Sequence, residues 1–310
     1  MRNMIVLQTI RIILIRASFL FILPFGYCEA ASQPPDLRTG ADVGKILVYP
    51  YRANTTGITI VGELASGDED AFRRSVLSIL QAGKLIQTVR IYSPGGDPKA
   101  AIDIGNQIRT LNTPTYAPFQ DSSGKRTCVL DSGVDNLNKW SGGTLGLMHY
   151  DASTGLGDKR CMCESACFLS WIAGVGRYGE SIGIHRVFFA PGMDYCVDGM
   201  CPNISASWAE EHYAPVKRIV TEYLQGMGAP DGIISRLFAT DINDMHYLNH
   251  SELLELRNDP PELTALIQRT CGPRPTSDDS ALDRWISCGY ALGEPRLRDA
   301  SFQYQNKYGR

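Results

Sequence analysis

The sequence contains no stretch in which lysine and arginine are interleaved with aromatic residues, although 30 of its 310 residues are basic. Such stretches supply the electrostatic attraction that dominates nucleic-acid binding, so their absence argues against a nucleic-acid partner. The chain also lacks internal repeats and low-complexity tracts, which excludes solenoids and extended linkers. Its composition is otherwise ordinary, with 44% hydrophobic and 20% charged residues, and predicts one large globular domain.

Long hydrophobic runs are also missing at the N-terminus, where the uncharged run 17–28 has only twelve residues. A bilayer-spanning helix needs roughly 20. Three arginines precede the run, and the small residues Ala30 and Ala31 follow it, as in a signal peptide. We therefore predict that residues 1–30 are a cleaved signal, that the mature protein is periplasmic or secreted, and that it has no membrane span. A lipoprotein attached through Cys28 is the alternative, disfavoured because Tyr27 stands where a small residue is expected.

Signal cleavage removes three arginines and one glutamate, so the formal net charge moves from −3 to −5. Eight cysteines remain, an even number that favours up to four disulfides in an oxidising compartment. The sequence does not choose among the possible pairings, although Cys196–Cys201 and Cys271–Cys288 are plausible local pairs. A zinc site at Cys161, Cys163 and Cys167 is the alternative, but this spacing lacks the paired knuckles of structural zinc sites.

Hydrophobic periodicity predicts an α/β fold with a mainly parallel sheet flanked by helices. Strands are expected at 46–51, 57–64 and 88–92, the first helix at 68–83 and the second after Gly96. The apolar periodicity is absent from 118–160, which we interpret as an insertion or long loop. A second insertion spans 191–205. A helix is expected to begin near Ser165, a strand to span 182–189 and a later helix to carry Pro215 in its first turn. Short helices are expected near 232–238, 251–257 and 281–288.

Three segments carry candidate chemistry. The predicted strand 88–92 ends at Ser93, Pro94, Gly95 and Gly96, and glycines there let backbone N–H groups stabilise a developing oxyanion. An ordinary strand-to-helix turn is the simpler interpretation of this motif taken alone.

The second segment is the helix start at Ser165. A serine in that position is most often an N-cap. Here, however, compact neighbours leave room for a substrate carbonyl, and a helix N-terminus directs its N–H groups toward the serine oxygen. The third segment is the apolar strand that ends at His185, twenty residues later. A histidine at such a place is usually structural, yet a helix followed by an adjacent strand can return a general base to the serine.

In this order the three segments resemble the Clp protease proteolytic subunit, a member of the crotonase-like superfamily built from repeated ββα units. The resemblance spans 57–257, and residues 31–258 would form the Clp-protease-like domain. Residues 259–310, with Cys271 and Cys288, have no counterpart and are expected to pack on the core as a disulfide-containing C-terminal extension. The resemblance rests on the turn from Ser93 to Gly96, Ser165 with Ala166, the downstream Ala173, Gly174 and Arg177, and the strand ending in His185.

The resemblance implies that Ser165 is the nucleophile, His185 the general base, and the amides of Gly96 and Ala166 the oxyanion hole, with Gly95 as the fallback donor. It also implies an acid before the helix near 251, where Asp244 fits best and Asp241 is the second choice. His246 and His250 are interpreted as surface residues of this turn. A homo-oligomer is expected because the family usually assembles into rings.

The sequence departs from the family at several points. The interval from Ser165 to His185 is shorter, and Arg186 and Val187 follow the histidine in place of the family's Gln-Pro. We expect an exported, ATP-independent serine peptidase that cleaves peptides or unfolded protein through an acyl-enzyme, without cofactor or metal. The alternatives are a non-catalytic binding or scaffold protein on the same fold and an enzyme acting on acyl-thioesters. A serine–lysine peptidase would need a lysine from elsewhere, because none follows Ser165 before Lys217.

Overall fold

The fold is described from a computed structural model, which places residues 46–52, 54–129, 147–151, 156–157, 159–187, 206–257, 261–275 and 279–309. The expected signal segment 1–30 and the pair Cys196–Cys201 lie outside these residues. The described residues belong to one compact unit. None of the helices within them is long and apolar enough to cross a membrane.

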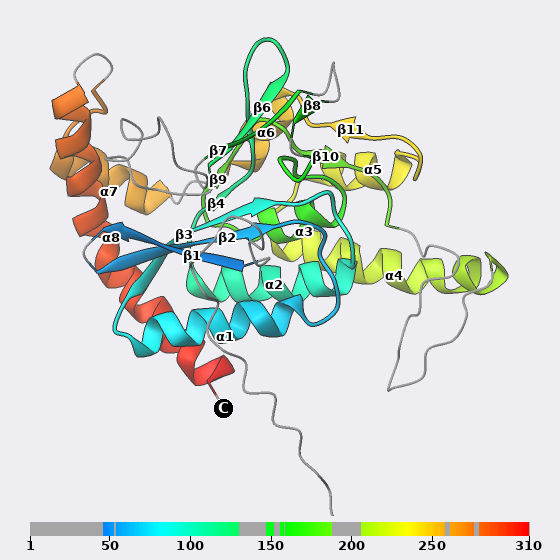
Figure 1. Ribbon diagram of the computed structural model, residues 1–310, viewed down its shortest axis with the longest axis horizontal. Coiled ribbons are helices and arrows are strands. Elements are labelled where there is room, and N and C mark those ends of the chain that lie inside the picture. The colour runs from blue at the N-terminus through cyan, green and yellow to red at the C-terminus, as the bar shows by residue number, and fades with distance from the viewer. Residues whose placement is uncertain are drawn as a thin grey trace, which may run out of the picture. The chain divides into compact units, whose positions relative to one another are not determined.

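The central sheet has the strand order β1-β2-β3-β4-β9. β1 pairs antiparallel with β2, and every other neighbouring pair is parallel. Two helices, α1 and α2, connect the parallel strands and run side by side along the sheet (Figure 1). The predicted α/β class with a mainly parallel sheet is therefore confirmed. The bounds are β1 (Ile46–Arg52), β2 (Thr55–Val61), α1 (Asp68–Gln81), β3 (Leu85–Tyr92), α2 (Pro98–Leu111), β4 (Thr115–Tyr116) and β9 (Arg177–Tyr178).

Apolar residues at helical spacing bury one face of α1 and of α2 against the sheet, as the periodicity predicts. Asp97 caps α2, because its side chain accepts a hydrogen bond from the Lys99 amide at 2.9 Å. This cap fixes the point where the chain leaves β3, turns and enters the helix. The buried positions are Phe72, Val76, Ile79 and Leu80 in α1, and Ile104, Ile108 and Leu111 in α2.

The segment interpreted as a loop at 118–160 contains a second, antiparallel sheet of order β5-β6-β7-β8. Its strands have only two to five residues and carry polar side chains on both faces of β6, so they show no periodic apolar signal. Backbone pairing holds these strands together. The bounds are β5 (Phe119–Gln120), β6 (Lys125–Val129), β7 (Leu147–Asp151) and β8 (Leu156–Gly157).

The second half of the chain is mainly helical. Pro215 lies inside α4, nine residues after the helix begins, so its predicted first-turn position is wrong. The residue is exposed, and water can therefore satisfy the carbonyl group that loses its partner. The bounds are α3 (Ala166–Trp171), β10 (Gly183–Ile184), α4 (Ala206–Gly226), α5 (Asp231–Ala239), β11 (His246–Tyr247), α6 (His250–Leu256), α7 (Pro261–Cys271) and α8 (Asp279–Tyr308).

The C-terminal helices pack on the core. α8 lies against α1, α2 and β3, and the buried Tyr304 hydroxyl hydrogen-bonds to Gln107 of α2. The predicted disulfide Cys271–Cys288 joins α7 to α8. The zinc alternative is wrong, because Cys161 bonds to Cys128 and Cys163 bonds to Cys167.

Arg177 of β9 connects the ends of three helices. Its guanidinium donates to the carbonyl oxygens of Gly174 at 3.1 Å and Leu256 at 2.9 Å, and also to that of Met227. These residues lie after α3, at the end of α6 and after α4, where helix dipoles present partial negative charge. Burial, together with the positive charge of the neighbouring Arg109, lowers the pKa of Arg177 to about 9. The guanidinium is thus held by carbonyl dipoles.

We predict that Arg177→Met lowers the free energy of unfolding by roughly 3 kcal/mol, because three buried carbonyl groups lose their donor. Urea denaturation of the oxidised protein measures this change. Arg298→Met is the control, since Arg298 is an exposed partner of Glu294 within α8 and should change stability by less than about 0.5 kcal/mol. Equal effects of the two substitutions would contradict the role given to Arg177.

Candidate active site

Five chain segments lie side by side beyond the carboxyl end of β3. Isolated parallel bridges join Leu64 to Gly96, Ser93 to Cys163 and Glu164 to Gly183. β10 then pairs antiparallel with β11. The predicted glycine turn, the predicted serine and the strand of the predicted histidine are therefore brought together, in the region where α/β folds place their functional groups.

Ser165 has an unusual backbone conformation, with φ 56° and ψ −122°. Non-glycine residues avoid this region, and one held there stores about 1–3 kcal/mol of strain, which is common at active sites. Its side chain makes no capping hydrogen bond to α3. Ser165 therefore stands at the N-cap position of α3 without capping the helix through its side chain, and its half-buried hydroxyl remains available for other chemistry.

Neighbouring groups hold this conformation from several sides. The Ser165 amide donates to the Gly183 carbonyl oxygen at 2.9 Å. The disulfide Cys163–Cys167 closes a short loop around the serine. On the facing turn, a Cβ atom added to Gly95 would lie 2.7 Å from Ser165 Cβ and 3.2 Å from Ser165 Oγ. The serine side chain thus lies against a surface that only glycine can provide.

The backbone N–H groups of Gly96 and Ala166 are directed away from the backbone groups with which adjacent residues form hydrogen bonds. The flanking groups of Gly96 bond to Leu64, since Leu64 N–H donates to Gly95 O and Asp97 N–H donates to Leu64 O. In a parallel bridge this leaves the Gly96 amide directed to the other side. Ala166 is the first residue of α3, where helical N–H groups lack internal partners.

The fallback donor is already occupied, because the Gly95 amide donates to Ser93 Oγ at 3.1 Å. The Ser93 hydroxyl in turn donates to the Gly95 carbonyl oxygen at 3.0 Å. Within the described residues, by contrast, neither the Gly96 nor the Ala166 amide has a hydrogen-bond acceptor. The geometry therefore favours Gly96 over Gly95 as a donor to a ligand oxygen.

His185 follows β10 directly and is 8% exposed. Its ring Nδ1 lies 2.9 Å from the Arg186 carbonyl oxygen, and a carbonyl can only accept, so Nδ1 carries the proton. This tautomer leaves Nε2 unprotonated, as a general base requires. Ser165 Oγ and the ring are not hydrogen-bonded in this structure, and such bonds often form only with substrate present.

The carboxylates of Asp244 and Asp241, the two candidates for the triad acid, make no contact with the His185 ring. The Asp244 side chain is exposed, and its backbone amide donates to the Asp241 carbonyl oxygen at 3.1 Å. Asp241 forms an ion pair with Arg186 at 3.0 Å, and hydrogen bonds from Asn243 lower the pKa of its carboxyl group. Neither carboxylate is bonded to His185, where the Arg186 carbonyl occupies the place expected for Asp244.

A buried charged cluster next to the serine escaped the sequence prediction. Glu164 accepts a hydrogen bond from Arg126 of β6 at 2.9 Å and another from the Tyr247 hydroxyl of β11. The Arg126 guanidinium also lies 4.9 Å from the centre of the Tyr247 ring. The Arg126 side chain is 5% exposed and that of Glu164 is 15% exposed. The predicted loop at 118–160 therefore supplies a side chain to the candidate site.

The protonation of this cluster follows from its contacts. Burial alone would lower the pKa of Arg126, but its contacts with Tyr247 and Glu164 raise the pKa above the ordinary value. Burial raises the pKa of Tyr247, and the hydrogen bond to Glu164 adds to the rise. Arg126 is thus charged and Tyr247 neutral at physiological pH. No group of His, Cys, Asp and Glu side chains suited to a metal ion occurs among the residues that the structure places.

No family model matches the chain, and no curated protein matches it in sequence. Among solved structures, it is similar to a mutant of the 1510-N membrane-bound stomatin-specific protease, with a TM-score of 0.36, 13% identity, and coverage of 70% of this chain and 83% of that one. It is also similar to ClpP1 from Listeria monocytogenes, with a TM-score of 0.36, 13% identity, and coverage of 66% and 88%. Scores of this size assign neither a family nor an activity.

We predict that Gly95→Ala displaces Ser165, because the new methyl group collides with its side chain. Gly62→Ala is a matched control, since Gly62 also has a positive φ, 96° against 113°, but a Cβ there would meet nothing within 4 Å. Both variants should lose about 1 kcal/mol in free energy of unfolding, because alanine is unfavourable at a positive φ. Urea denaturation measures this loss. Only Gly95→Ala should lose at least about tenfold in the rate at which a fluorophosphonate labels Ser165. Equal labelling of both variants would show that the close contact does not position the serine.

Proposed function

We propose that this chain is an exported, ATP-independent serine peptidase that cleaves peptides or unfolded protein. The observation that carries the proposal is the backbone of Ser165. Its strained φ places the hydroxyl against the glycine turn, beside two amides that lack acceptors and next to the strand of His185. A serine that only caps a helix needs none of these features, whereas a nucleophile needs a neighbouring general base and donors for the oxyanion.

In the proposed reaction, Ser165 Oγ attacks the substrate carbonyl carbon while its proton passes to His185 Nε2. The carbonyl oxygen becomes an oxyanion and accepts hydrogen bonds from the Gly96 and Ala166 amides. Collapse of this intermediate breaks the C–N bond, and the imidazolium protonates the leaving amine. A water molecule, deprotonated by His185, then attacks the acyl-enzyme ester and releases the acid product and the serine.

The third member of the catalytic set is proposed to be the Arg186 carbonyl group. Its hydrogen bond with Nδ1 fixes the imidazole tautomer, which is one of the two roles an acid performs in a serine–histidine–acid triad. A neutral carbonyl stabilises the imidazolium less than a carboxylate would. The enzyme would therefore rely on orientation more than on charge at this position.

The disulfide bonds of the described residues support the proposal that the protein is exported. Three disulfides join described cysteines, and one of them encloses the proposed nucleophile. Disulfides form and persist in oxidising compartments, which agrees with the signal-peptide pattern of residues 1–30. An exported enzyme has no ATPase partner of the kind found inside cells, so its substrates would be short or already unfolded chains.

The central prediction concerns Ser165. Wild-type protein should be labelled by a fluorophosphonate probe and should cleave an unstructured fluorogenic peptide library. Ser165→Ala should abolish labelling and reduce kcat/KM by at least about 10³-fold with an unchanged unfolding transition. Ser170→Ala is the control, because this buried serine lies in α3, the helix that follows Ser165, and donates to the Ala101 carbonyl oxygen. A folded wild-type protein that is never labelled would instead indicate a binding or scaffold protein.

A second prediction distinguishes the Arg186 carbonyl group from an aspartate carboxylate as the group that orients the His185 ring. Asp244→Asn and Asp241→Asn should each change kcat by less than about threefold, because neither carboxylate contacts His185. A true triad acid would cost about 10⁴-fold when changed to asparagine. His185→Gln should remove at least about 10³-fold. A loss of that size for Asp244→Asn would restore Asp244 as the acid and require the turn 241–245 to move when substrate binds.

A further inference from the structure

A cavity lies between the central sheet and the C-terminal helices, away from Ser165. Its volume is about 290 Å³, near the lower end of the range of roughly 300–1,000 Å³ typical of small-molecule sites. Gln87 of β3 lines it, six residues before Ser93, so the length of strand between the cavity and the candidate active site is roughly 20 Å. The cavity is therefore distinct from the proposed catalytic groups.

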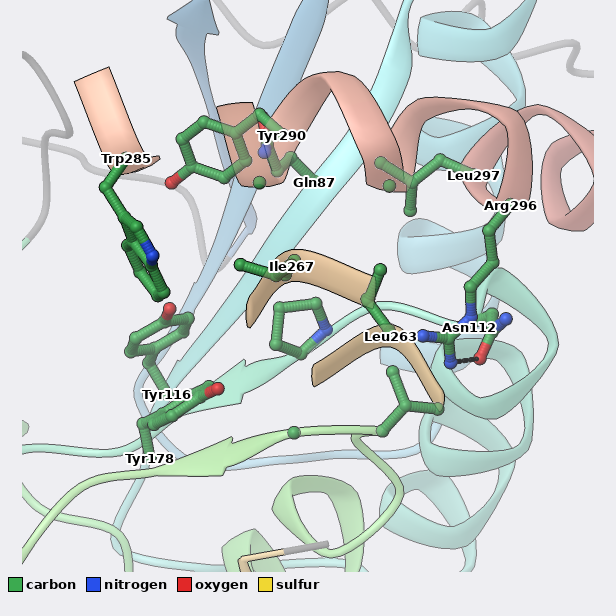
Figure 2. A pocket seen from close by; sticks show the side chains of 15 residues that line it. Gln87, Asn112, Tyr116, Tyr178, Leu263, Ile267, Trp285, Tyr290, Arg296 and Leu297 are labelled. Atoms are coloured by element: carbon green, nitrogen blue, oxygen red, sulfur yellow. Dashed lines mark hydrogen bonds between the residues drawn. The ribbon is translucent and has the colours of Figure 1, made fainter. Parts of the chain in front are cut away.

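Apolar and aromatic side chains form most of the cavity wall. At one end the rings of Tyr116 and Tyr178 are stacked with centroids 4.9 Å apart, and Trp285 lies beside them (Figure 2). Leu263 and Ile267 of α7 line the space between these rings and the opposite end. A wall of this kind accommodates the apolar body of a ligand.

A guanidinium group lies at the opposite end of the cavity. Arg296 of α8 points toward Leu263, and its Nη2 donates a hydrogen bond to the side-chain oxygen of Asn112 (Figure 2). A guanidinium carries five N–H donors, so this neutral partner uses only one of them. Nε and Nη1 of Arg296 have no acceptor within the described residues, and neither atom is fully buried. The cavity wall therefore has donors that a ligand can reach.

The positive charge of Arg296 lacks a carboxylate as hydrogen-bond partner. Glu262 of α7 is exposed and attracts the guanidinium, but no carboxylate of the described residues forms an ion pair with Arg296. Burial, opposed in part by the attraction of Glu262, lowers the pKa of Arg296 below its ordinary value. A half-buried cation with only a neutral amide as its partner is stabilised by an anion, and a carboxylate accepts charge-assisted hydrogen bonds from the remaining donors.

The cavity does not need a ligand in order to form. The disulfide Cys271–Cys288 joins α7 to α8, and Trp285 Nε1 donates to the Gly272 carbonyl oxygen at 2.9 Å. Gly293 of α8 leaves space open, since a Cβ atom added there would meet nothing within 4 Å. A preformed site loses little binding free energy to the ordering of its walls.

We propose that this cavity binds a small monocarboxylate with an apolar body. The carboxylate accepts hydrogen bonds from the Arg296 donors that Asn112 does not use. The apolar body lies against Leu263 and Ile267 and extends toward the aromatic rings at the other end. A cationic ligand is disfavoured because Arg296 repels it, and a neutral one leaves the guanidinium without an anion. The proposal is independent of catalysis at Ser165.

Isothermal titration calorimetry with matched acids and amides tests this proposal. The probes are 4-phenylbutyrate and 6-phenylhexanoate, whose chains differ in length, together with the primary amide of each acid. At least one acid should bind the oxidised protein about tenfold more tightly than its amide, because charge-assisted hydrogen bonds are stronger than neutral ones. The proposal is overturned if neither acid binds, or if each amide binds as tightly as its acid.

A substitution of Arg296 tests the group that recognises the carboxylate. Arg296→Met should weaken binding of that acid about tenfold, to the level of its amide, and should leave the affinity for the amide unchanged. Arg298→Met is the matched control, since Arg298 is an exposed partner of Glu294 two residues further along α8, and it should bind the acid as the wild type does. An unchanged affinity for the acid in Arg296→Met would contradict the role given to this residue.

A cavity-filling variant locates the bound acid. Gly293→Leu places a side chain in the open space and should abolish binding of the acid while a cooperative unfolding transition is retained. Gly232→Leu is the matched control, since Gly232 is a helical glycine in α5 with no atom within 4 Å of an added Cβ, and its affinity for the acid should equal that of the wild type. Binding retained in Gly293→Leu would show that the acid binds outside this cavity and would overturn the proposal.

Discussion

The backbone of Ser165 has a conformation that an L-residue adopts only under constraint, and much of the surrounding structure supplies that constraint. A disulfide encloses the residue, the Gly183 carbonyl fixes its amide, and Gly95 leaves no room for its side chain to turn back. Strain of about 1–3 kcal/mol persists only where several contacts determine the same geometry. The parallel sheet provides these contacts, because segments that are distant in the sequence meet at the carboxyl end of its strands.

Two buried guanidinium groups stabilise this arrangement in different ways. Arg126 faces the carboxylate of Glu164 and ties the small antiparallel sheet to the residue before the serine. Arg177 instead donates to backbone carbonyl oxygens at helix ends, and its planar fork reaches three of them at once. The first contact positions the candidate site. The second fixes the helices that pack around it.

Periodic burial made the central fold predictable: Phe72, Val76 and Ile79 mark α1 because a helix covering a sheet must repeat apolar residues at helical spacing. The serine and the glycine turn could be singled out as candidates because short contiguous motifs mark them in the sequence. Arg126 was missed because its partner Glu164 is 38 residues away and its strand lacks apolar alternation. The contact of the histidine ring was also unpredictable, since the backbone carbonyl of Arg186 has no side-chain signature.

The bridge between Cys163 and Cys167 has a consequence for when the backbone conformation of Ser165 can form. A newly made chain whose thiols are still reduced lacks the covalent loop that forces the serine into its strained shape, and the residue can relax to an ordinary helix start. Oxidation of the two thiols is then the step that completes the strained conformation of Ser165.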